Sequence, residues 1–440
     1  MMKNTLLFAI LLLVSSGLHA QTSNTQKLDS LFQKIGTNNK GMGTFSLFKD
    51  GKEVYQKAFG YADVENQQKA DAKTKYRIGS ISKTFTAVII MQLVDEGKLT
   101  LATKLDKYFP QIPNSEKITI EQLLRHQSGL FSFTSTPDYT SWMTKPKSRE
   151  EMLRMFVDNA TVFEPGEKNE YSNTNYVLLS FIAEELDEKR FPDIVQLRII
   201  KPCKLETTFY GEKINPKNDE ALSYARKEEW QLQPETDMSI PVGAGAIVST
   251  ATDLNTFFSC LFGGKLVSDT SLSKMKDIKN NYGMGLFPLP FYKMKGFGHT
   301  GGIDGFQSMA SYFPEEGIAV SYISNGVVMP VNDIMIAALS IYLGMDYELP
   351  GFKPALTLKP EDLDSYLGVY SSPAFPLKIT ITKNENILIA QATGQASIPL
   401  EAFEKDKFRF QQANLVLEFK PSENQVLLLQ NGMRFELTKE

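Results

Sequence analysis

The chain has 440 residues, 42% of them hydrophobic and 22% charged, and its formal net charge at pH 7 is −4. This length exceeds one ordinary domain and allows a large hydrophobic core. The mild charge, without a basic cluster or an acidic tail, excludes a nucleic-acid-binding protein. The three histidines and two cysteines form no metal-binding pattern and no Walker-type loop is present, so a metal-dependent hydrolase is not expected.

The first predicted element, residues 1–20, is a secretory signal peptide. Lys3 supplies a positive start, residues 6–14 an apolar core and residues 18–20 (Leu-His-Ala) a small-residue cleavage site. The apolar run is too short for a comfortable membrane span, and no later stretch approaches about 20 apolar residues. We therefore expect an exported protein, periplasmic or secreted, that begins at Gln21 and keeps no membrane anchor.

Strand-like alternation predicts two strands early in the mature chain, at residues 43–49 and 53–61, and further strands after residue 295. The long stretch between them is dominated by helical periods with glycine and proline punctuation. This order predicts an α+β fold in which both ends of a domain spanning residues 21–350 build one sheet, with a helical region beside it.

The segment Ser80-Ile81-Ser82-Lys83 stands at the start of a predicted helix, which Gly97 closes. Residues three apart share one helix face, so the Ser80 hydroxyl and the Lys83 amine can lie side by side. Lys83 would ease removal of the hydroxyl proton, and the helix N-terminus would favour developing negative charge. The alternative is a capping serine with a snorkelling lysine.

The same Ser-x-x-Lys pattern occurs twice more in the chain. Residues 46–49 lie in a strand-like run, and residues 271–274 lie in a polar stretch that could begin a surface helix. Neither is followed by the apolar helix pattern that follows Ser80, so Ser80 is the predicted nucleophile.

An irregular loop between two helix patterns carries the second motif, Tyr171-Ser172-Asn173. Beside a lysine ammonium the Tyr171 phenol would lose its proton more easily than at its ordinary pKa near 10. The Asn173 amide could donate to a substrate carbonyl. The alternative is an asparagine-rich turn with a half-buried tyrosine.

Two cysteines remain in the mature chain, Cys203 and Cys260. Export makes a disulfide chemically possible. Cys260 lies in the apolar run at residues 257–262, however, and this favours two buried thiols.

The third motif is the glycine-rich segment at residues 298–306, followed by strand candidates at 309–312 and 318–323. Glycines at a strand let a substrate backbone approach, and the Gly302 N–H could pair with the Ser80 N–H as an oxyanion hole. His299 would project into the same cleft as a donor to the substrate. The alternative is a glycine-rich hairpin turn with an exposed histidine.

Prolines and glycine at residues 349–354 and Lys359-Pro360 predict a linker, placed at residues 351–361. Short strands are then predicted, and Asn431-Gly432 is a hairpin signal before the last of them. The strands lie at residues 377–382, 387–391, 408–411, 415–419, 426–429 and 433–437. A small antiparallel barrel or sandwich over residues 362–440, with a covering or packing role, fits this pattern.

The three motifs, in this order and spacing, resemble those of the serine β-lactamase and penicillin-binding-protein superfamily. The nearest branch contains class C β-lactamases, DD-carboxypeptidases, D-aminopeptidases and esterases. The resemblance extends from about residue 28 to 345 and includes the segments 123–130, 163–166, 243–250, 282–286 and 323–326. It implies a β-lactamase-like antiparallel sheet flanked by helices, with a mostly helical subdomain. The C-terminal β domain resembles a barrel appended to some members.

The resemblance also implies roles for single residues. Ser80 matches the nucleophile that forms an acyl-enzyme, and Lys83 matches the lysine that activates it. Tyr171 matches a general base and leaving-group acid, and Asn173 matches a contact to the substrate amide. His126 looks like a structural histidine of the loop that it opens.

His299-Thr300-Gly301 occupies the place of the family's Lys-Thr-Gly substrate-binding motif, and Gly302 that of the second oxyanion donor. A lysine there is a permanent cation, whereas a histidine with a pKa near 6.5 is mostly neutral at pH 7. The attraction for a substrate carboxylate is therefore weakened.

Together these features predict a cofactor-free, metal-free serine hydrolase for small molecules or short peptides, of D-aminopeptidase, amidase or esterase type. A β-lactamase or DD-carboxypeptidase is the first alternative, and a non-catalytic binding module is the second. The oligomeric state stays open.

Overall fold

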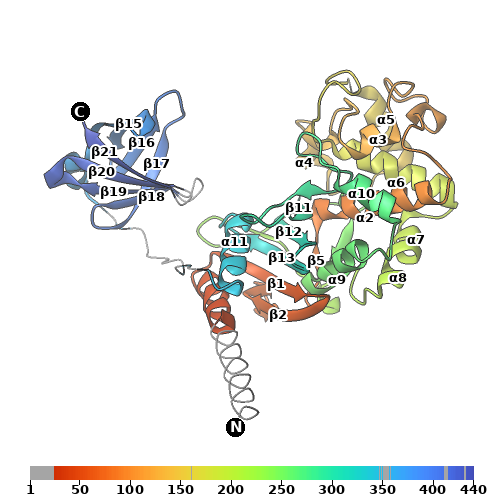
Figure 1. The fold of residues 1–440 in the computed structure, drawn as a ribbon, viewed down its shortest axis with the longest axis horizontal. Helices are drawn as coiled ribbons and strands as arrows, with labels where there is room; N and C mark the ends of the chain where they lie inside the picture. Colours follow the sequence, from red (N-terminus) through yellow and green to blue (C-terminus); the bar gives the residue numbers. More distant parts are fainter. Residues whose placement is uncertain are drawn as a thin grey trace, which may run out of the picture. The chain divides into compact units, whose positions relative to one another are not determined.

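The computed structural model describes residues 24–159, 161–345, 347, 349, 356, 358–410, 415–430 and 433–440. The chain divides into two compact units between Glu348 and Leu349, both labelled in Figure 1. The predicted signal peptide, part of the predicted linker and the hairpin signal Asn431-Gly432 lie outside the described residues. None of the described helices has the length and apolar character that a membrane span requires.

The first unit contains a six-stranded antiparallel sheet in the order β10-β11-β12-β13-β1-β2. Strands from both ends of the unit build this sheet, as predicted, but β10 precedes residue 295 and was not predicted. Their bounds are Gly41–Lys49 (β1), Lys52–Phe59 (β2), Phe287–Pro288 (β10), Phe297–Ile303 (β11), Phe306–Phe313 (β12) and Ile318–Val327 (β13).

Helices cover both faces of this sheet. Successive strand residues point to opposite faces, and in β1 the Phe45 ring packs 4.9 Å from Phe32 of the helical residues 24–37. Ser46, the next residue of β1, instead accepts a hydrogen bond from Asn255 of α9 (Ala251–Phe262) at 3.0 Å. The sheet is therefore the middle layer, with α9 on one face and the N-terminal helix on the other (Figure 1).

The long middle part of the chain is mostly helical, as predicted, and contains short accessory strands. Its helices are α2 (Ser82–Asp95), α3 (Ile120–Leu124), α4 (Tyr139–Trp142), α5 (Arg149–Asp158), α6 (Asn173–Asp187), α7 (Phe191–Val195), α8 (Lys201–Cys203), α9 and α10 (Asp269–Lys276), with α11 (Val331–Tyr342) after the sheet. The short strands are β3 (Tyr61–Asp63), β4 (Gln68–Lys69), β5 (Tyr76–Arg77), β6 (Phe209–Tyr210), β7 (Tyr224–Arg226), β8 (Trp230–Leu232) and β9 (Ile247–Ser249).

Helix α2 lies at the centre of the first unit. It begins just after the 3-10 turn η1 (Gly79–Ile81) and is followed by Gly97 at a φ of +71°. The apolar spacing predicts one buried face, yet nearly every residue of α2 is buried. The threonines satisfy their hydroxyls on neighbouring loops, Thr84 on the Gly285 carbonyl and Thr86 on the Gly243 carbonyl, both at 2.7 Å. The start of α2 is therefore held on all sides.

Cys203 of α8 and Cys260 of α9 form a disulfide, with Cα atoms 5.9 Å apart. The prediction of two buried thiols is wrong. The apolar run around Cys260 correctly indicated burial, but burial does not exclude a bond when two helices bring the cysteines together. The pairing joins residues 57 apart in the sequence.

Replacement of both cysteines by alanine is expected to lower the free energy of unfolding by about 4 kcal/mol. Without the bond, the unfolded chain regains the entropy of the loop that the bond closes. Denaturant unfolding of the oxidised protein and the double variant measures the difference. Equal midpoints, with the bond confirmed by mass in the wild type, would contradict this expectation.

The second unit is a closed eight-stranded antiparallel barrel, which decides between the barrel and the sandwich. It is formed by β14 (Gly368–Ser372), β15 (Phe375–Asn384), β16 (Ile387–Ala392), β17 (Ile398–Glu404), β18 (Lys407–Phe410), β19 (Leu415–Lys420), β20 (Gln425–Gln430) and β21 (Met433–Lys439). Strands β14 and β17 were not predicted. Pairing of β14 with β21 closes the barrel and removes its open edges, and apolar side chains fill its interior.

Candidate active site

Ser80 lies in η1, directly against strand β11. Gly79 has a φ of +52°, and a Cβ atom on it would lie 2.8 Å from the Gly302 nitrogen. A Cβ atom on Gly301 would lie 2.0 Å from the Ile78 carbonyl oxygen. Glycine at both positions therefore allows the two backbones to touch, and this contact brings Gly302 beside Ser80.

Ser80 and Gly302 line one cavity of about 420 Å³. Its wall also includes Asn173 from the start of α6 and residues from three other segments, at positions 133–143, 233–245 and 303–304. These further residues are Phe133, Thr134, Tyr139, Thr140, Met143, Gln233, Pro234, Thr236, Pro241, Ala244, Gly245, Ile303 and Asp304. The cavity is large enough for a small molecule or a short peptide end.

Lys83 is fully buried in the first turn of α2. Its Nζ lies 3.0 Å from the Ser80 Oγ, 2.8 Å from the Asn173 Oδ1 and 2.7 Å from the Ala244 carbonyl oxygen. None of these partners is a carboxylate. Burial holds the pKa of the Lys83 amine well below its ordinary value, because no neighbouring anion offsets the loss of hydration.

Tyr171 lies in the loop before α6 and faces both Ser80 and Lys83. The Lys83 Nζ lies 4.9 Å from the centre of its ring. Burial raises the pKa of the Tyr171 phenol above its ordinary value, and a hydrogen bond with the Ser80 side chain offsets this only in part. The predicted lowering of this pKa is wrong. Burial disfavours the charged phenolate, and it also lowers the pKa of the Lys83 amine, whose positive charge would have stabilised that phenolate.

Asn173 connects Lys83 to the opposite wall of the cavity. Its Oδ1 accepts from Lys83, and its Nδ2 donates to the Thr134 Oγ1 at 2.8 Å. A longer contact of 3.4 Å joins the Nδ2 to the Ser132 Oγ. These neighbours orient the Asn173 amide, and one of its two N–H groups makes only the longer contact to Ser132.

His299 of β11 is buried, 2% exposed, and is not among the residues that line the cavity. Its Nδ1 donates to the Thr300 carbonyl and its ring meets Phe287 edge-on, with ring centres 4.7 Å apart. Burial lowers the pKa of His299 to about 3. The ring is therefore neutral at pH 7. His299, Thr300 and Gly301 do not line the cavity, whereas Gly302, Ile303 and Asp304 of the same segment do.

The sequence analysis missed a buried ion pair beside the cavity. Arg77 donates to the Asp304 Oδ2 at 2.9 Å, and neither side chain is more than 1% exposed. Asp304 also accepts from the backbone N–H and the hydroxyl of Thr236, and Glu235 pairs with Arg77 at 2.5 Å. These residues are far apart in the chain, so no local pattern could have joined them.

Acidification from pH 6.5 to pH 5 is expected to lower the free energy of unfolding through two buried histidines. Burial also holds the pKa of His126 well below its ordinary value. In this range the unfolded imidazoles bind protons and the native ones stay neutral, so stability is full above pH 6.5 and falls below it. Each histidine contributes up to about 1.4 kcal/mol per pH unit.

Urea unfolding at a series of pH values measures this slope. The His299→Gln variant should lose the contribution of one proton, and the surface variant Lys73→Gln should keep the wild-type slope. A His299→Gln slope equal to that of the wild type would contradict the expectation.

Comparisons with known proteins agree with this fold. The family model described as Beta-lactamase matches residues 28–340. Penicillin-binding protein 4* of Bacillus subtilis (strain 168) is 27% identical over 429 residues, covering 89% of this chain and 93% of that protein. Teichoic acid D-alanine hydrolase of Staphylococcus aureus (strain MRSA252) is 29% identical over 245 residues, covering 55% of this chain and 59% of that protein.

Solved structures give the same result. The D-amino acid amidase from Ochrobactrum anthropi SV3, complexed with D-phenylalanine, has a TM-score of 0.65 at 27% identity and covers 72% of this chain and 99% of its own. The octameric penicillin-binding protein homologue from Pyrococcus abyssi has a TM-score of 0.68 at 27% identity and covers 94% of this chain and 99% of its own. The family model alone spans more than half of the sequence, and the chain therefore belongs to the beta-lactamase family.

Proposed function

We propose that this protein is an exported serine hydrolase that forms an acyl-enzyme on Ser80. Its substrates are small amides or esters of D-aminopeptidase, amidase or esterase type. The observation that carries the proposal is the 3.0 Å contact between the Lys83 Nζ and the Ser80 Oγ, made by a fully buried amine whose partners include no carboxylate.

Lys83 is the base for the attack in this proposal. A neutral amine has two N–H donors, which the Asn173 and Ala244 oxygens accept. Its lone pair then faces the Ser80 hydroxyl, which donates to it. As the Ser80 Oγ attacks the carbonyl carbon, its proton passes to the Lys83 Nζ.

Tyr171 is the acid for the leaving group. Its raised pKa keeps the phenol protonated at neutral pH, so the hydroxyl can give its proton to the leaving nitrogen or oxygen and regain one from Lys83. The Ser80 and Gly302 N–H groups stabilise the oxyanion. Water then hydrolyses the acyl-enzyme.

The strand β11 and the first residue of α6 supply the remaining substrate contacts. Strand β10 pairs only with Phe297 and Gly298, which leaves the backbone at Thr300 and Gly301 for a substrate running along this edge. Asn173 contacts the substrate amide. The neutral His299 supports β11 from the buried side and gives no cation to a substrate carboxylate.

The charges of the cavity wall support the choice of substrate. Among the described residues that line it, none is lysine, arginine or histidine, and Asp304 is the one charged group. A substrate carboxylate has no cationic partner there, whereas a neutral or ammonium-bearing acyl group is tolerated. The similar D-amino acid amidase and teichoic acid D-alanine hydrolase fit this substrate class.

The disulfide between Cys203 and Cys260 supports export, because such bonds persist mainly in oxidising compartments. Fractionation of the native host would place the mature protein outside the cytoplasm. Recovery of the full-length chain with reduced thiols from the cytoplasm would contradict this part of the proposal.

The test is intact-mass detection of acylated Ser80 together with turnover of four compound classes: D-aminoacyl amides, short-chain esters, D-Ala-D-Ala peptides and penicillins. We expect labelling and turnover with amides or esters, and weak reaction with the two carboxylate-bearing classes. Rapid penicillin turnover would favour a β-lactamase. Preferred cleavage of the D-Ala-D-Ala peptide would favour a DD-carboxypeptidase. Absence of any labelling would favour a binding module.

A further inference from the structure

The loop that carries Tyr171 is held by one residue from another part of the chain. Tyr171 belongs to no helix or strand, so its own backbone does not fix its position. The Glu170 N–H donates to the His126 carbonyl at 2.9 Å, and the Ser172 N–H donates to the His126 Nδ1 at 3.1 Å. His126 therefore binds the backbone on both sides of Tyr171.

The His126 ring also lies on the Tyr171 ring. The ring centres are 4.4 Å apart and the planes are 25° from parallel. His126 is 2% exposed and has a φ of +56°, a conformation that costs a residue other than glycine some backbone energy. The His126 carbonyl makes one contact to this tripeptide and its buried side chain makes two, so together they limit where the Tyr171 hydroxyl can lie.

Tyr282 completes this arrangement from the other side. Its ring meets the His126 ring edge-on, with centres 5.5 Å apart. Burial raises the pKa of the Tyr282 phenol, and the nearby Tyr171 backbone offsets this in part. We call His126 and Tyr282 the tyrosine clamp. Together they hold the backbone at residues 170, 171 and 172.

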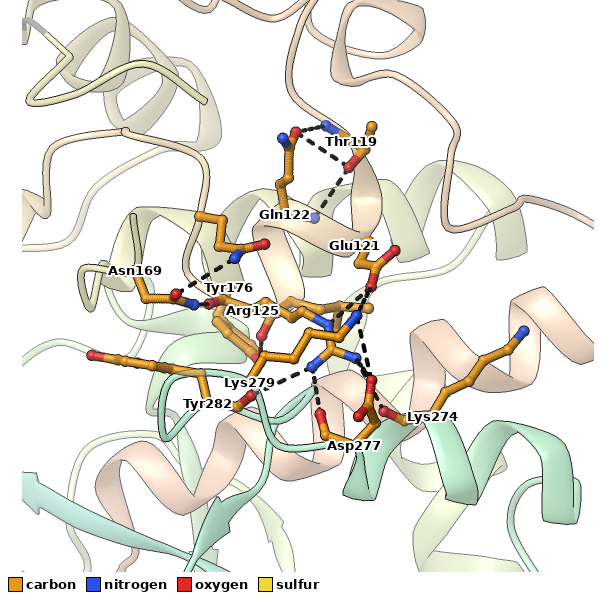
Figure 2. Close-up of polar contacts among 12 residues, drawn as sticks. Thr119, Glu121, Gln122, Arg125, Asn169, Tyr176, Lys274, Asp277, Lys279 and Tyr282 are labelled. Atoms are coloured by element: carbon orange, nitrogen blue, oxygen red, sulfur yellow. Dashed lines mark hydrogen bonds and ion pairs between the residues drawn. The ribbon is translucent and has the colours of Figure 1, made fainter. Parts of the chain in front are cut away.

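Arg125, the residue before His126, contacts the segment that carries Tyr282, and Figure 2 shows these contacts. It precedes His126 at the end of α3 and is 2% exposed. Its guanidinium donates to Glu121 at 3.0 Å, to the Asp277 carboxylate at 3.2 Å and to the Asp277 carbonyl at 2.6 Å. A longer contact of 3.4 Å reaches the Tyr282 carbonyl. The segment at residues 277–282 is thereby fastened to the residue that precedes His126.

The Arg125 backbone also holds the far end of the tyrosine loop. The Asn169 Nδ2 donates to the Arg125 carbonyl at 2.8 Å, and Asn280 donates to the Asn169 Oδ1 at 3.0 Å. The Tyr171 loop, the end of α3 and the segment after α10 thus form one hydrogen-bonded unit (Figure 2). The charge of the Arg125 guanidinium is balanced by the Glu121 and Asp277 carboxylates. Lys279 lies 3.4 Å from the Asp277 carboxylate and shares it.

We propose that His126 is a positioning residue for the hydrolase reaction, supported by Tyr282 and Arg125: it holds the Tyr171 hydroxyl against Ser80. The proposal rests on the proposed function, in which Tyr171 transfers a proton to the leaving group. Such a transfer depends steeply on geometry, and a misplacement of about 1 Å costs on the order of 100-fold in rate. His126 itself does not touch the reacting atoms.

A double-mutant cycle between positions 126 and 171 tests this proposal. His126→Phe keeps an aromatic ring but removes the acceptor for the Ser172 N–H. In the wild type it should lower kcat by about 10- to 100-fold while KM changes by less than about 3-fold. In a Tyr171→Phe background, where no hydroxyl is left to position, the same change should lower kcat by less than about 2-fold.

Two conservative variants give graded results. His126→Asn offers an amide oxygen to the Ser172 N–H and should recover part of the kcat lost in His126→Phe. Tyr282→Phe removes only the hydroxyl near the Tyr171 backbone and should lower kcat several-fold. If His126→Phe fails to fold, the same double-mutant cycle with Tyr171→Phe is measured with these two variants instead.

Thr119→Ala is the matched control for loss of stability in the same helix. It removes the cap in which the Thr119 Oγ1 accepts from the Gln122 N–H. It should lower the thermal midpoint by about 2 °C with kcat unchanged.

Equal losses of kcat from His126→Phe in both backgrounds would overturn the positioning role, as would an unchanged kcat in the wild-type background. An unchanged kcat in Tyr171→Phe alone would instead overturn the role of Tyr171 in the proposed function. The two failures are therefore distinguishable.

Discussion

Replacement of Ser80 by alanine is expected to lower kcat/KM by at least about 10⁴-fold for every substrate that the protein turns over. The variant has no oxygen nucleophile, and neither Lys83 nor Tyr171 can form the acyl-enzyme in its place. Turnover assays and intact-mass labelling measure the effect, and labelling should disappear altogether. The fold should persist, because the change removes a single partly exposed hydroxyl.

Ser271→Ala is the matched control, since Ser271 also begins a Ser-x-x-Lys sequence. Ser271 lies on α10, outside the cavity, and its hydroxyl donates to the Asp95 carboxylate at 2.6 Å. It should keep wild-type kcat/KM. Hydrolysis retained in Ser80→Ala at more than about a hundredth of the wild-type rate would show that another group carries the reaction.

Replacement of Lys83 by methionine is expected to lower kcat/KM by about 10⁴-fold through loss of the base. The free energy of unfolding should stay the same or increase. The lysine amine is fully buried with no carboxylate among its hydrogen-bond partners, and methionine fills similar volume without a group that favours water. Activity and stability should therefore change in different directions.

The dependence of kcat/KM on pH tests the same residue in the wild type. Burial lowers the pKa of the Lys83 amine, and in the proposed function the neutral amine is the form that accepts the proton. Acidification should protonate Lys83 and reduce the rate, and alkalisation should not improve it further. A Lys83→Met variant that loses activity only because it unfolds, with a lower denaturation midpoint, would contradict this account.

Local sequence patterns were enough to predict the nucleophile and its base. Ser80 and Lys83 are three residues apart at a helix start, and that spacing alone makes the side chains neighbours. The same reasoning separated Ser46, which lies in β1, from Ser80. Alternating and helical periods likewise predicted that both ends of the first unit build one sheet, and they predicted most strands of the barrel, because these periods are visible over a few consecutive residues.

Contacts between distant residues could not be predicted in the same way. The disulfide, the Arg77–Asp304 pair and the contacts of His126 to the Tyr171 loop join segments that no periodicity relates. The motif placed His299 correctly on a strand, but its alternation did not show that a hydrophobic ring would cover this side of β11.

The sequence by itself therefore determined the family and the fold, and it predicted Ser80 and Lys83 as neighbours, since these depend on residue types at short spacings. Only the tertiary structure decided the direction in which the pKa values of Lys83, Tyr171 and His299 shift, because burial by residues far away in the chain sets the cost of each charge. The nucleophile depends on four consecutive residues, whereas the acid, the base and the charge of the cavity depend on the packing of the whole unit.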